Sequence, residues 1–149
     1  MPKVYAIIRG NGDILVGSGG NVGNPPIMRT GLHLPGGTYN TSNESPINAA
    51  LREVSEETGI QLLPQDVLDS FTIPLDGRQV TFVVFEVFCV PDAIATREPP
   101  LVTNPHDEPF ATLLSLPIYQ CYNNPGFAAQ YGTDWFAAGL QHAYETHLL

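Results

Sequence analysis

The segment between residues 45 and 59 constrains this chain most, because it carries both the start and the stop signals of an α-helix. Ser45 can accept hydrogen bonds at the N-cap, and Pro46 suits the first helical position. Gly59 supplies the glycine that ends many helices. Between these limits one stripe of side chains recurs at helical spacing and should face a core: Ile47, Leu51, Val54 and Thr58.

Segments that predict β-strands lie on both sides of this helix. They are residues 3–9, 14–16, 28–34, 69–75 and 79–90. Glycine and proline should make residues 18–26 and 91–109 irregular, and a break is expected at residues 35–37. A last helix should begin at Thr133 or Asp134. Its apolar side chains are Trp135, Phe136, Leu140 and Ala143.

Length and composition fit one globular α/β domain spanning residues 1–149, with 43% hydrophobic and 14% charged residues. Strands around a central helix, followed by a terminal helix, indicate a mixed β-sheet covered by helices. Apolar stretches such as residues 82–85 are too short to span a bilayer, and residues 1–5 lack a signal-peptide core. We therefore expect a cytoplasmic protein in which Cys89 and Cys121 are ordinary small core residues.

The charge balance limits the partners that the chain can bind. Fifteen acidic residues stand against six basic ones, for a net charge of −9, and Lys3 is the only lysine. Such a surface repels the phosphate backbone of a nucleic-acid polymer. A small polyphosphate would be repelled too, unless a metal ion neutralises both sides.

Three glutamates lie at the end of the predicted helix, where negative charges destabilise a helix. Glu53, Glu56 and Glu57 lie at positions i, i+3 and i+4, so their carboxylates leave the helix on one side. Like charges at this spacing cost roughly 0.2–0.5 kcal/mol each. The helix dipole disfavours anions in the last turn by perhaps a further ~0.3–1 kcal/mol each. Arg52 can pair with Glu56 and offset only part of this cost.

Two interpretations of these acids remain open from the residues alone. One is a solvated acidic surface, which is the usual meaning of a charge run. The other is a metal site, because a local rule broken without local benefit tends to mark function. Gly36 and Gly37 lie just upstream and can bring backbone carbonyls close to a bound cation. Clustered hard oxygen ligands suit Mg²⁺, with Mn²⁺ as an alternative.

The segment from Gly37 to Ile60 resembles the Nudix box, G-x5-E-x7-R-E-U-x-E-E-x-G-U, in which U is a bulky aliphatic residue. Eight positions match at the right spacing: Glu44, Arg52, Glu53, Val54, Glu56, Glu57, Gly59 and Ile60. Six residues instead of five separate Gly37 from Glu44, so Thr38 occupies the strict glycine position. We interpret this as a longer loop in which Gly37 keeps the role of the glycine. The alternative is a remodelled loop whose carbonyl no longer reaches a metal, which also puts Glu44 in doubt.

This resemblance implies a Nudix-type α/β/α sandwich with a mixed β-sheet, a catalytic loop-helix and a C-terminal helix. It implies metal ligation by Glu53, Glu56 and Glu57, with the Gly37 carbonyl as a fourth ligand. Arg52 would orient these ligands through salt bridges, and Glu44 would brace the loop. The implied activity is metal-dependent hydrolysis of a phosphoanhydride bond in a nucleoside diphosphate linked to another moiety. Relatives are often dimers, so a homodimer is an open expectation.

The general base is not fixed by the resemblance, because clustered acids around shared metals titrate as a unit. Our order of preference is Glu56 or Glu53, followed by Glu108. Glu108 belongs to the segment His106-Asp107-Glu108, where related enzymes often place an additional acid. A plain surface loop is the alternative interpretation of this segment.

Other charges lie outside the box. Glu86 interrupts the apolar face of a predicted strand and should pair with Arg9 or Arg78, or else contact a substrate. Arg9 and Arg29 are candidate phosphate-binding cations, with ordinary surface arginines as the simpler interpretation. A nucleotide sensor of the same fold that does not cleave its ligand is the alternative function, and the complete set of box acids argues against it.

Overall fold

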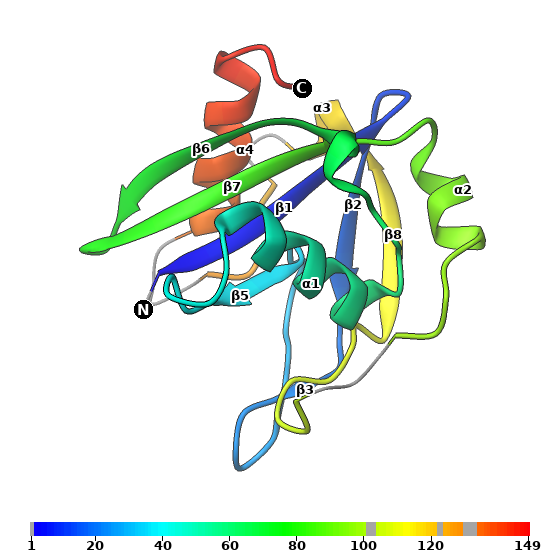
Figure 1. The fold of residues 1–149 in the computed structure, drawn as a ribbon. Helices are drawn as coiled ribbons and strands as arrows, with labels where there is room; N and C mark the ends of the chain where they lie inside the picture. The colour runs from blue at the N-terminus through cyan, green and yellow to red at the C-terminus, as the bar shows by residue number, and fades with distance from the viewer. Residues whose placement is uncertain (1, 101–103, 122–123, 130–133) are drawn as a thin grey trace.

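The fold is built around one mixed sheet of six strands (Figure 1). The computed structural model describes residues 2–100, 104–121, 124–129 and 134–149. The strand order is β6-β7-β1-β2-β8, with β5 also paired to β1. The strands of this sheet are β1 (Lys3–Gly10), β2 (Asp13–Ser18), β5 (Gly36–Thr38), β6 (Val67–Leu75), β7 (Arg78–Glu86) and β8 (Thr112–Pro117).

The remaining elements are a small hairpin and the helices. The hairpin consists of β3 (Asn21–Val22) and β4 (Ile27–Met28). The helices are α1 (Pro46–Thr58), the 3₁₀ turn η1 (Pro64–Asp66), α2 (Val90–Ala95), α3 (Ile118–Cys121) and α4 (Trp135–Glu145). Within the described residues, no helix is long and apolar enough to cross a membrane.

Strand β1 lies at the centre of the sheet, where it pairs with three other strands. It runs parallel to β7 and antiparallel to β2 and β5. The pairs with β2 lie at its C-terminal end, at Arg9 and Gly10. The pairs with β5 lie at its N-terminal end, where Val4 is opposite Gly37. Strand β5 therefore pairs with the N-terminal half of the same edge of β1 whose C-terminal end pairs with β2. This pairing places Gly36 and Gly37 inside the sheet.

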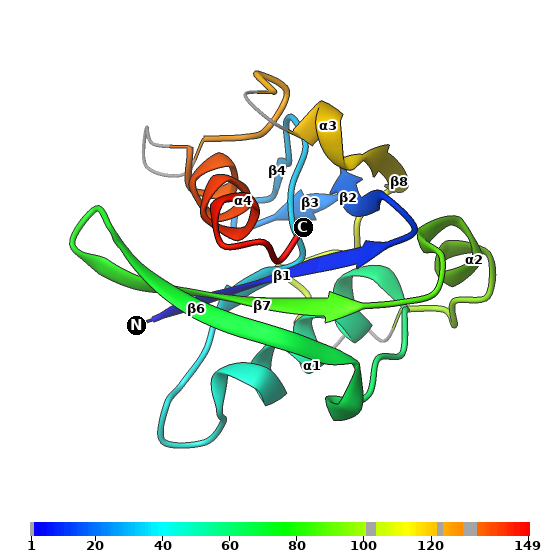
Figure 2. The same cartoon turned by 90° about the horizontal axis from the view of Figure 1, so that it is seen from above.

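Two apolar cores cover the two faces of the sheet. Figure 2 shows α4 on one side and α1 on the other. The core on the α4 side contains Tyr5, Ile7, Phe82, Trp135 and Phe136, among others. The core on the α1 side contains Val4, Ala6, Ala50, Val54 and Phe85, among others. Because successive residues of a strand point to opposite faces, alternating residues of β1 and β7 supply both cores. The α/β architecture with helices on both faces is thus as predicted.

Helix α1 begins and ends as the sequence predicts. The Ser45 hydroxyl accepts a hydrogen bond from the Asn48 amide at 3.1 Å. Gly59 has φ of 79° and donates to the Ser55 carbonyl at 3.0 Å. A left-handed residue at this point costs glycine little, so the helix ends there. Of the predicted core stripe, Val54 and Thr58 are fully buried. Ile47 and Leu51 pack against the same core while partly exposed.

Helix α4 is held at its start by two aspartates. The Asp134 carboxylate accepts a hydrogen bond from the Ala137 amide at 3.0 Å, which caps the helix as expected. The Trp135 indole donates to the Asp76 carboxylate at 2.6 Å. Asp76 lies in the turn between β6 and β7, so this contact ties α4 to the far hairpin of the sheet.

Two predictions for the segment before α1 were wrong. The strand expected at residues 28–34 is not formed: Met28 ends the short strand β4, and beyond it only single bridges occur, between His33 and Gly17 and between Leu32 and Phe127. The loop expected at residues 18–26 instead contains β3, which pairs with β4. Pro35 does break the chain, but β5 begins directly after it, at Gly36.

The segment after β7 also differs from expectation. Strand β7 ends at Glu86, and part of the expected loop from residue 91 forms helix α2. Pro91 stands in the first turn of α2, where a missing amide is tolerated. Strand β8 was not predicted at all; it pairs antiparallel with β2 and ends at Pro117. Both cysteines are free. Cys121 is buried in the core as predicted, whereas Cys89 is only partly buried.

We predict that Gly139→Ala destabilises the fold although alanine favours helices. A methyl group at Gly139 would collide with the fully buried Phe82 ring. Overpacking of this kind costs roughly 1–3 kcal/mol, against about 1 kcal/mol gained in helix propensity. Urea unfolding should therefore show a net loss of up to about 2 kcal/mol. Gln141→Ala, at an exposed site on the same helix, serves as the control and should leave stability within about 0.5 kcal/mol.

Candidate active site

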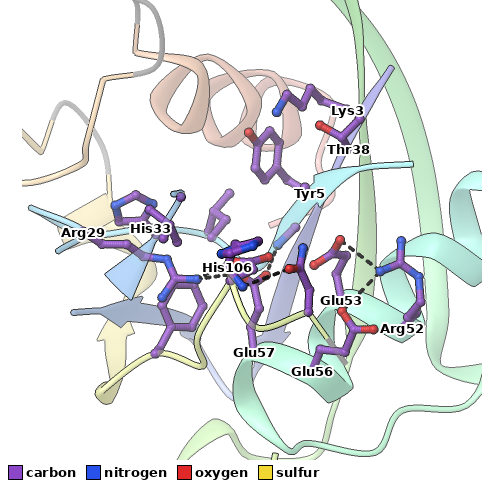
Figure 3. Close-up of a pocket in the computed structure, with 18 of the residues that line it drawn as sticks. Lys3, Tyr5, Arg29, His33, Thr38, Arg52, Glu53, Glu56, Glu57 and His106 are labelled. Atoms are coloured by element: carbon purple, nitrogen blue, oxygen red, sulfur yellow. Dashed lines mark hydrogen bonds and ion pairs between the residues drawn. The ribbon is translucent and has the colours of Figure 1, made fainter. Parts of the chain in front are cut away.

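A pocket of about 580 Å³ opens where the second half of α1 meets β5 and the loop that precedes β8. Figure 3 shows the acidic residues of α1 on one side of it, with Lys3, Tyr5 and Thr38 on another. Arg29 and His33, from the segment between β4 and β5, line a third side.

Three carboxylates meet in this pocket. Glu53, Glu57 and Asp107 each offer one oxygen, and the three oxygens lie within 4.8 Å of one another. Glu53 and Glu57 are each only 4% exposed, although both are charged in water. A carboxylate is very rarely buried without a partner, so this cluster requires a source of positive charge.

Arg29 supplies part of that charge. Its guanidinium Nη2 lies 3.2 Å from Glu57 Oε2 and 2.7 Å from Asp107 Oδ1. Nη1 donates to the Gly19 carbonyl at 3.0 Å, and the guanidinium carbon stands 4.7 Å from the centre of the Phe110 ring. The Arg29 side chain is only 4% exposed, so it is a buried ion-pair partner and not the surface arginine that was one interpretation.

Arg52 neutralises the other acids of the box. Its Nε and Nη2 donate to the two oxygens of Glu44 at 2.8 and 2.9 Å, a bidentate pair. Its Nη1 lies 3.2 Å from Glu53 Oε1 and 3.2 Å from Glu56 Oε2. The predicted pairing of Arg52 with Glu56 is therefore present, and one guanidinium holds three carboxylates.

The extra residue before Glu44 is accommodated in a tight turn. The Asn40 carbonyl accepts hydrogen bonds from the amides of Asn43 and Glu44, both at 3.0 Å. The Asn40 side chain accepts from the Ser42 amide at 3.0 Å. Glu44 consequently reaches Arg52 despite the longer loop.

The diglycine segment packs directly against the acids. The Gly36 amide donates to Glu57 Oε1 at 2.7 Å. A side chain at Gly36 would collide with the Val4 carbonyl, and a methyl group at Gly37 would lie 2.9 Å from Glu53 Oε1. Gly36 therefore requires glycine, whereas a side chain at Gly37 would displace the Glu53 carboxylate; the backbone of Gly37 borders the carboxylate cluster.

Burial shifts the proton equilibria of the cluster. Burial raises the pKa of Glu53 to about 7, against the opposing charge of Arg52. Burial and the neighbouring charge of Glu53 hold the pKa of Glu57 well above its ordinary value. Burial likewise raises the pKa of Asp107, although Arg29 and, more weakly, Lys3 oppose this. All three acids thus resist ionisation unless more positive charge enters the pocket.

The donors present fit a divalent cation. Glu53 Oε2 is buried and has no hydrogen-bond partner among the described residues, so a lone pair is left over. Hard carboxylate oxygens in this number suit Mg²⁺, which combines a few carboxylates with waters and substrate phosphates. Glu53, Glu57 and Asp107 could hold such an ion, with the Gly37 backbone beside them.

Not every candidate residue from the sequence reaches this cluster. Glu56 lines the pocket but is bound to Arg52. Glu108 turns away, and its carboxylate accepts a hydrogen bond from the Asn21 amide at 2.9 Å. Its neighbour Asp107 enters the cluster instead.

Two charges at the end of the sheet also differ from expectation. Glu86 is exposed and not buried, and its only described ion pair is with Arg9 at 4.0 Å. The predicted pairing is therefore present but weak, as expected of exposed charges. Arg9 also donates to the Leu148 carbonyl at 3.3 Å and does not line the pocket.

The sequence pattern of the NUDIX domain family matches residues 2–113 of this chain. This range includes the whole of helix α1 and the loop that carries Asp107. The chain belongs to the NUDIX domain family. No curated protein sequence matches it significantly.

Solved structures share the fold at low sequence identity. The MutT protein from Methanosarcina mazei Go1 superposes with a TM-score of 0.55 at 22% identity, covering 97% of this chain and 95% of its own. An ADP compounds hydrolase gives 0.60 at 15% identity, covering 99% and 74%. A C. elegans Ap4A hydrolase gives 0.56 at 15% identity, covering 98% and 97%. The α/β fold of the Nudix type is thereby confirmed.

We predict that the metal-free protein loses stability as pH rises. Because the pKa of Glu53 is about 7 in the folded chain and near 4.5 when unfolded, the folded state binds more protons in this interval. The free energy of unfolding should therefore fall between about pH 4.5 and pH 7 and stay low above it. Urea unfolding in EDTA at several pH values measures this.

Glu53→Gln should flatten that decline and make the metal-free protein more stable than wild type at pH 8, since it removes a buried charge. Glu98→Gln, at an exposed position, serves as the control and should follow wild type. Identical pH profiles for wild type and Glu53→Gln would contradict the assigned cause.

Proposed function

We propose that this protein hydrolyses a phosphoanhydride bond in a nucleoside diphosphate linked to another moiety, with Mg²⁺ or Mn²⁺ as the cofactor. One observation carries the proposal: Glu53, Glu57 and Asp107 converge within 4.8 Å in a pocket, and the buried Oε2 of Glu53 has no hydrogen-bond partner in the described part of the chain. Divalent ions bound there would neutralise the phosphates and lower the pKa of a bound water.

The residues of the chain have distinct roles in this proposal. Glu53, Glu57 and Asp107 hold the cation, together with the Gly37 carbonyl and, from the edge of the pocket, Glu56. Arg52 is a positioning residue, because it fixes Glu53 and Glu56 from one guanidinium. Arg29 is a second one, which orients Glu57 and Asp107.

The general base in this proposal is Glu53 or Glu56. A base must be ionised when it accepts the proton of water, and a bound cation would oppose the burial that raises the pKa of Glu53 to about 7 in the metal-free site. Glu56 lies at the edge of the pocket, where a water has access to it. Glu108 is no longer a candidate base in this proposal, because its carboxylate binds the Asn21 amide.

The substrate class follows from size, charge and resemblance. A pocket of about 580 Å³ suits a small molecule. The net charge of −9 disfavours a nucleic-acid polymer. The names of two similar structures refer to ADP compounds and to Ap4A, which are nucleotide derivatives. A cytoplasmic location and homodimer formation stay predictions from the sequence.

The proposal predicts Mg²⁺-dependent release of phosphate or pyrophosphate from at least one compound in a panel. The panel contains ADP-ribose, dinucleoside polyphosphates, nucleotide sugars and oxidised dNTPs. Loss of a residue that only supports a metal ligand typically lowers activity roughly 10–100-fold. Glu57→Gln should lower turnover by more than this, because Glu57 is itself a proposed metal ligand. Its fold should persist, as judged by circular dichroism. Binding without release from any compound would favour the nucleotide sensor instead.

A matched pair of neighbours tests the source of the third carboxylate. Asp107→Asn should weaken Mn²⁺ binding about 10-fold or more, whereas Glu108→Gln should change it less than about 2-fold. Titration calorimetry with Mn²⁺ alone measures both and needs no substrate. Equal losses in the two variants would mean that the loop rearranges and that Asp107 has no special role.

A further inference from the structure

Three side chains with a permanent positive charge line the pocket: Lys3, Arg29 and Arg52. The two arginines are already engaged by carboxylates, at distances between 2.7 and 3.2 Å. Lys3 differs, because no carboxylate of the described residues lies within 4.0 Å of its ammonium group, although its charge acts on Asp107 from a greater distance. Burial lowers the pKa of His33, so its imidazole adds little charge near neutral pH.

Among the described residues, neither Lys3 nor Arg97 makes an ion pair with a carboxylate within 4.0 Å, and of these two only Lys3 lines the pocket. Lys3 is also the only lysine of the chain. Because Arg29 and Arg52 are bound to the acids of the site, the Lys3 ammonium is the pocket cation that is available to a bound anion. A lysine in a pocket that meets a small polyphosphate is a natural anion-binding group.

The sheet register fixes where Lys3 stands relative to the carboxylates. Lys3 is opposite Thr38, and the next residue of β1, Val4, is opposite Gly37. The backbone of Gly37 borders the Glu53 carboxylate. Lys3 is thus adjacent in β1 to the residue that pairs with Gly37, and its charge acts on Asp107 of the cluster. Figure 3 shows Lys3 and Thr38 side by side at the end of the pocket away from Arg29.

We propose that Lys3 is a specificity-determining residue that binds a phosphate beyond the two phosphates joined by the scissile bond. The preferred substrates are then nucleotide derivatives with three or more phosphates in a row. The reason is charge: a diphosphate at the carboxylate end is neutralised there, whereas a further phosphate needs its own cation. The Thr38 hydroxyl, opposite Lys3, is available to donate to the same phosphate.

This inference rests on the proposed function, because it assumes a diphosphate at the carboxylate cluster. A neutral sugar or base at the Lys3 end is the competing arrangement. Inorganic pyrophosphate and inorganic tripolyphosphate separate the two, since they differ only in the third phosphate. Their binding in the presence of Mg²⁺ can be measured by titration calorimetry even if no nucleotide is hydrolysed.

The test compares wild type with Lys3→Met, Lys3→Arg and Arg97→Met. Lys3→Met should weaken tripolyphosphate binding roughly 10-fold or more, as expected for a lost charged hydrogen bond, and pyrophosphate binding less than about 2-fold. Lys3→Arg should keep most of the affinity for tripolyphosphate. Arg97→Met removes one positive charge from an exposed site outside the pocket and should change neither.

Steady-state kinetics of the active enzyme give a second, independent measurement of the role of Lys3. Lys3→Met should raise KM for diadenosine tetraphosphate with kcat little changed, and should leave KM for ADP-ribose nearly unaltered. Equal weakening of both inorganic probes would mean that Lys3 contacts the scissile diphosphate, and no effect on either would mean that it contacts no phosphate. Either result overturns the inference. Absence of any hydrolysis by wild type would instead overturn the proposed function, while the binding test still decides the role of Lys3.

Discussion

The close approach of two adjacent glycines of β5 to a helix with three acids is the constraint on which the rest of the structure depends. Gly36 and Gly37 pair with the central strand and at the same time touch the carboxylates of α1. Any larger residue at Gly36 would strike the Val4 carbonyl, so the strand could not pair as it does. The sheet therefore sets the position of the acidic helix, and the pocket is the space that remains beside them.

Two arginines, Arg29 and Arg52, stabilise the buried carboxylates in the folded chain. Buried carboxylates are costly, and removing one partner of a buried pair leaves an uncompensated charge. Arg52 holds Glu44, Glu53 and Glu56, while Arg29 holds Glu57 and Asp107 from the opposite side. The two networks neutralise the acids only in part, because the pKa values of Glu53, Glu57 and Asp107 remain raised. The remaining demand for positive charge is the physical basis of the proposed metal dependence.

The sequence was sufficient to predict the helix and its acidic residues, but not to predict that Arg29 and Asp107 complete the site. Caps, apolar spacing and the box pattern are local, so Ser45, Gly59 and the glutamates could be read directly. Arg29 and Asp107 are separated by 78 residues and meet only through the fold. No local pattern distinguishes Asp107 from Glu108, because the difference is which of two adjacent side chains turns inward. Strand β8 was likewise missed, since its pairing with β2 is a long-range contact.

The small hairpin of β3 and β4 is joined to the loop that carries Asp107. The Gly23 amide donates to the His106 carbonyl at 2.7 Å, and the Glu108 amide donates to the Asn21 carbonyl at 3.0 Å. Asp107 is therefore held from both sides by a segment outside the main sheet. The position of Asp107 therefore depends on the β3–β4 hairpin and not on the six-stranded sheet. A change in that hairpin can move this one acid while the sheet and the other two acids stay in place.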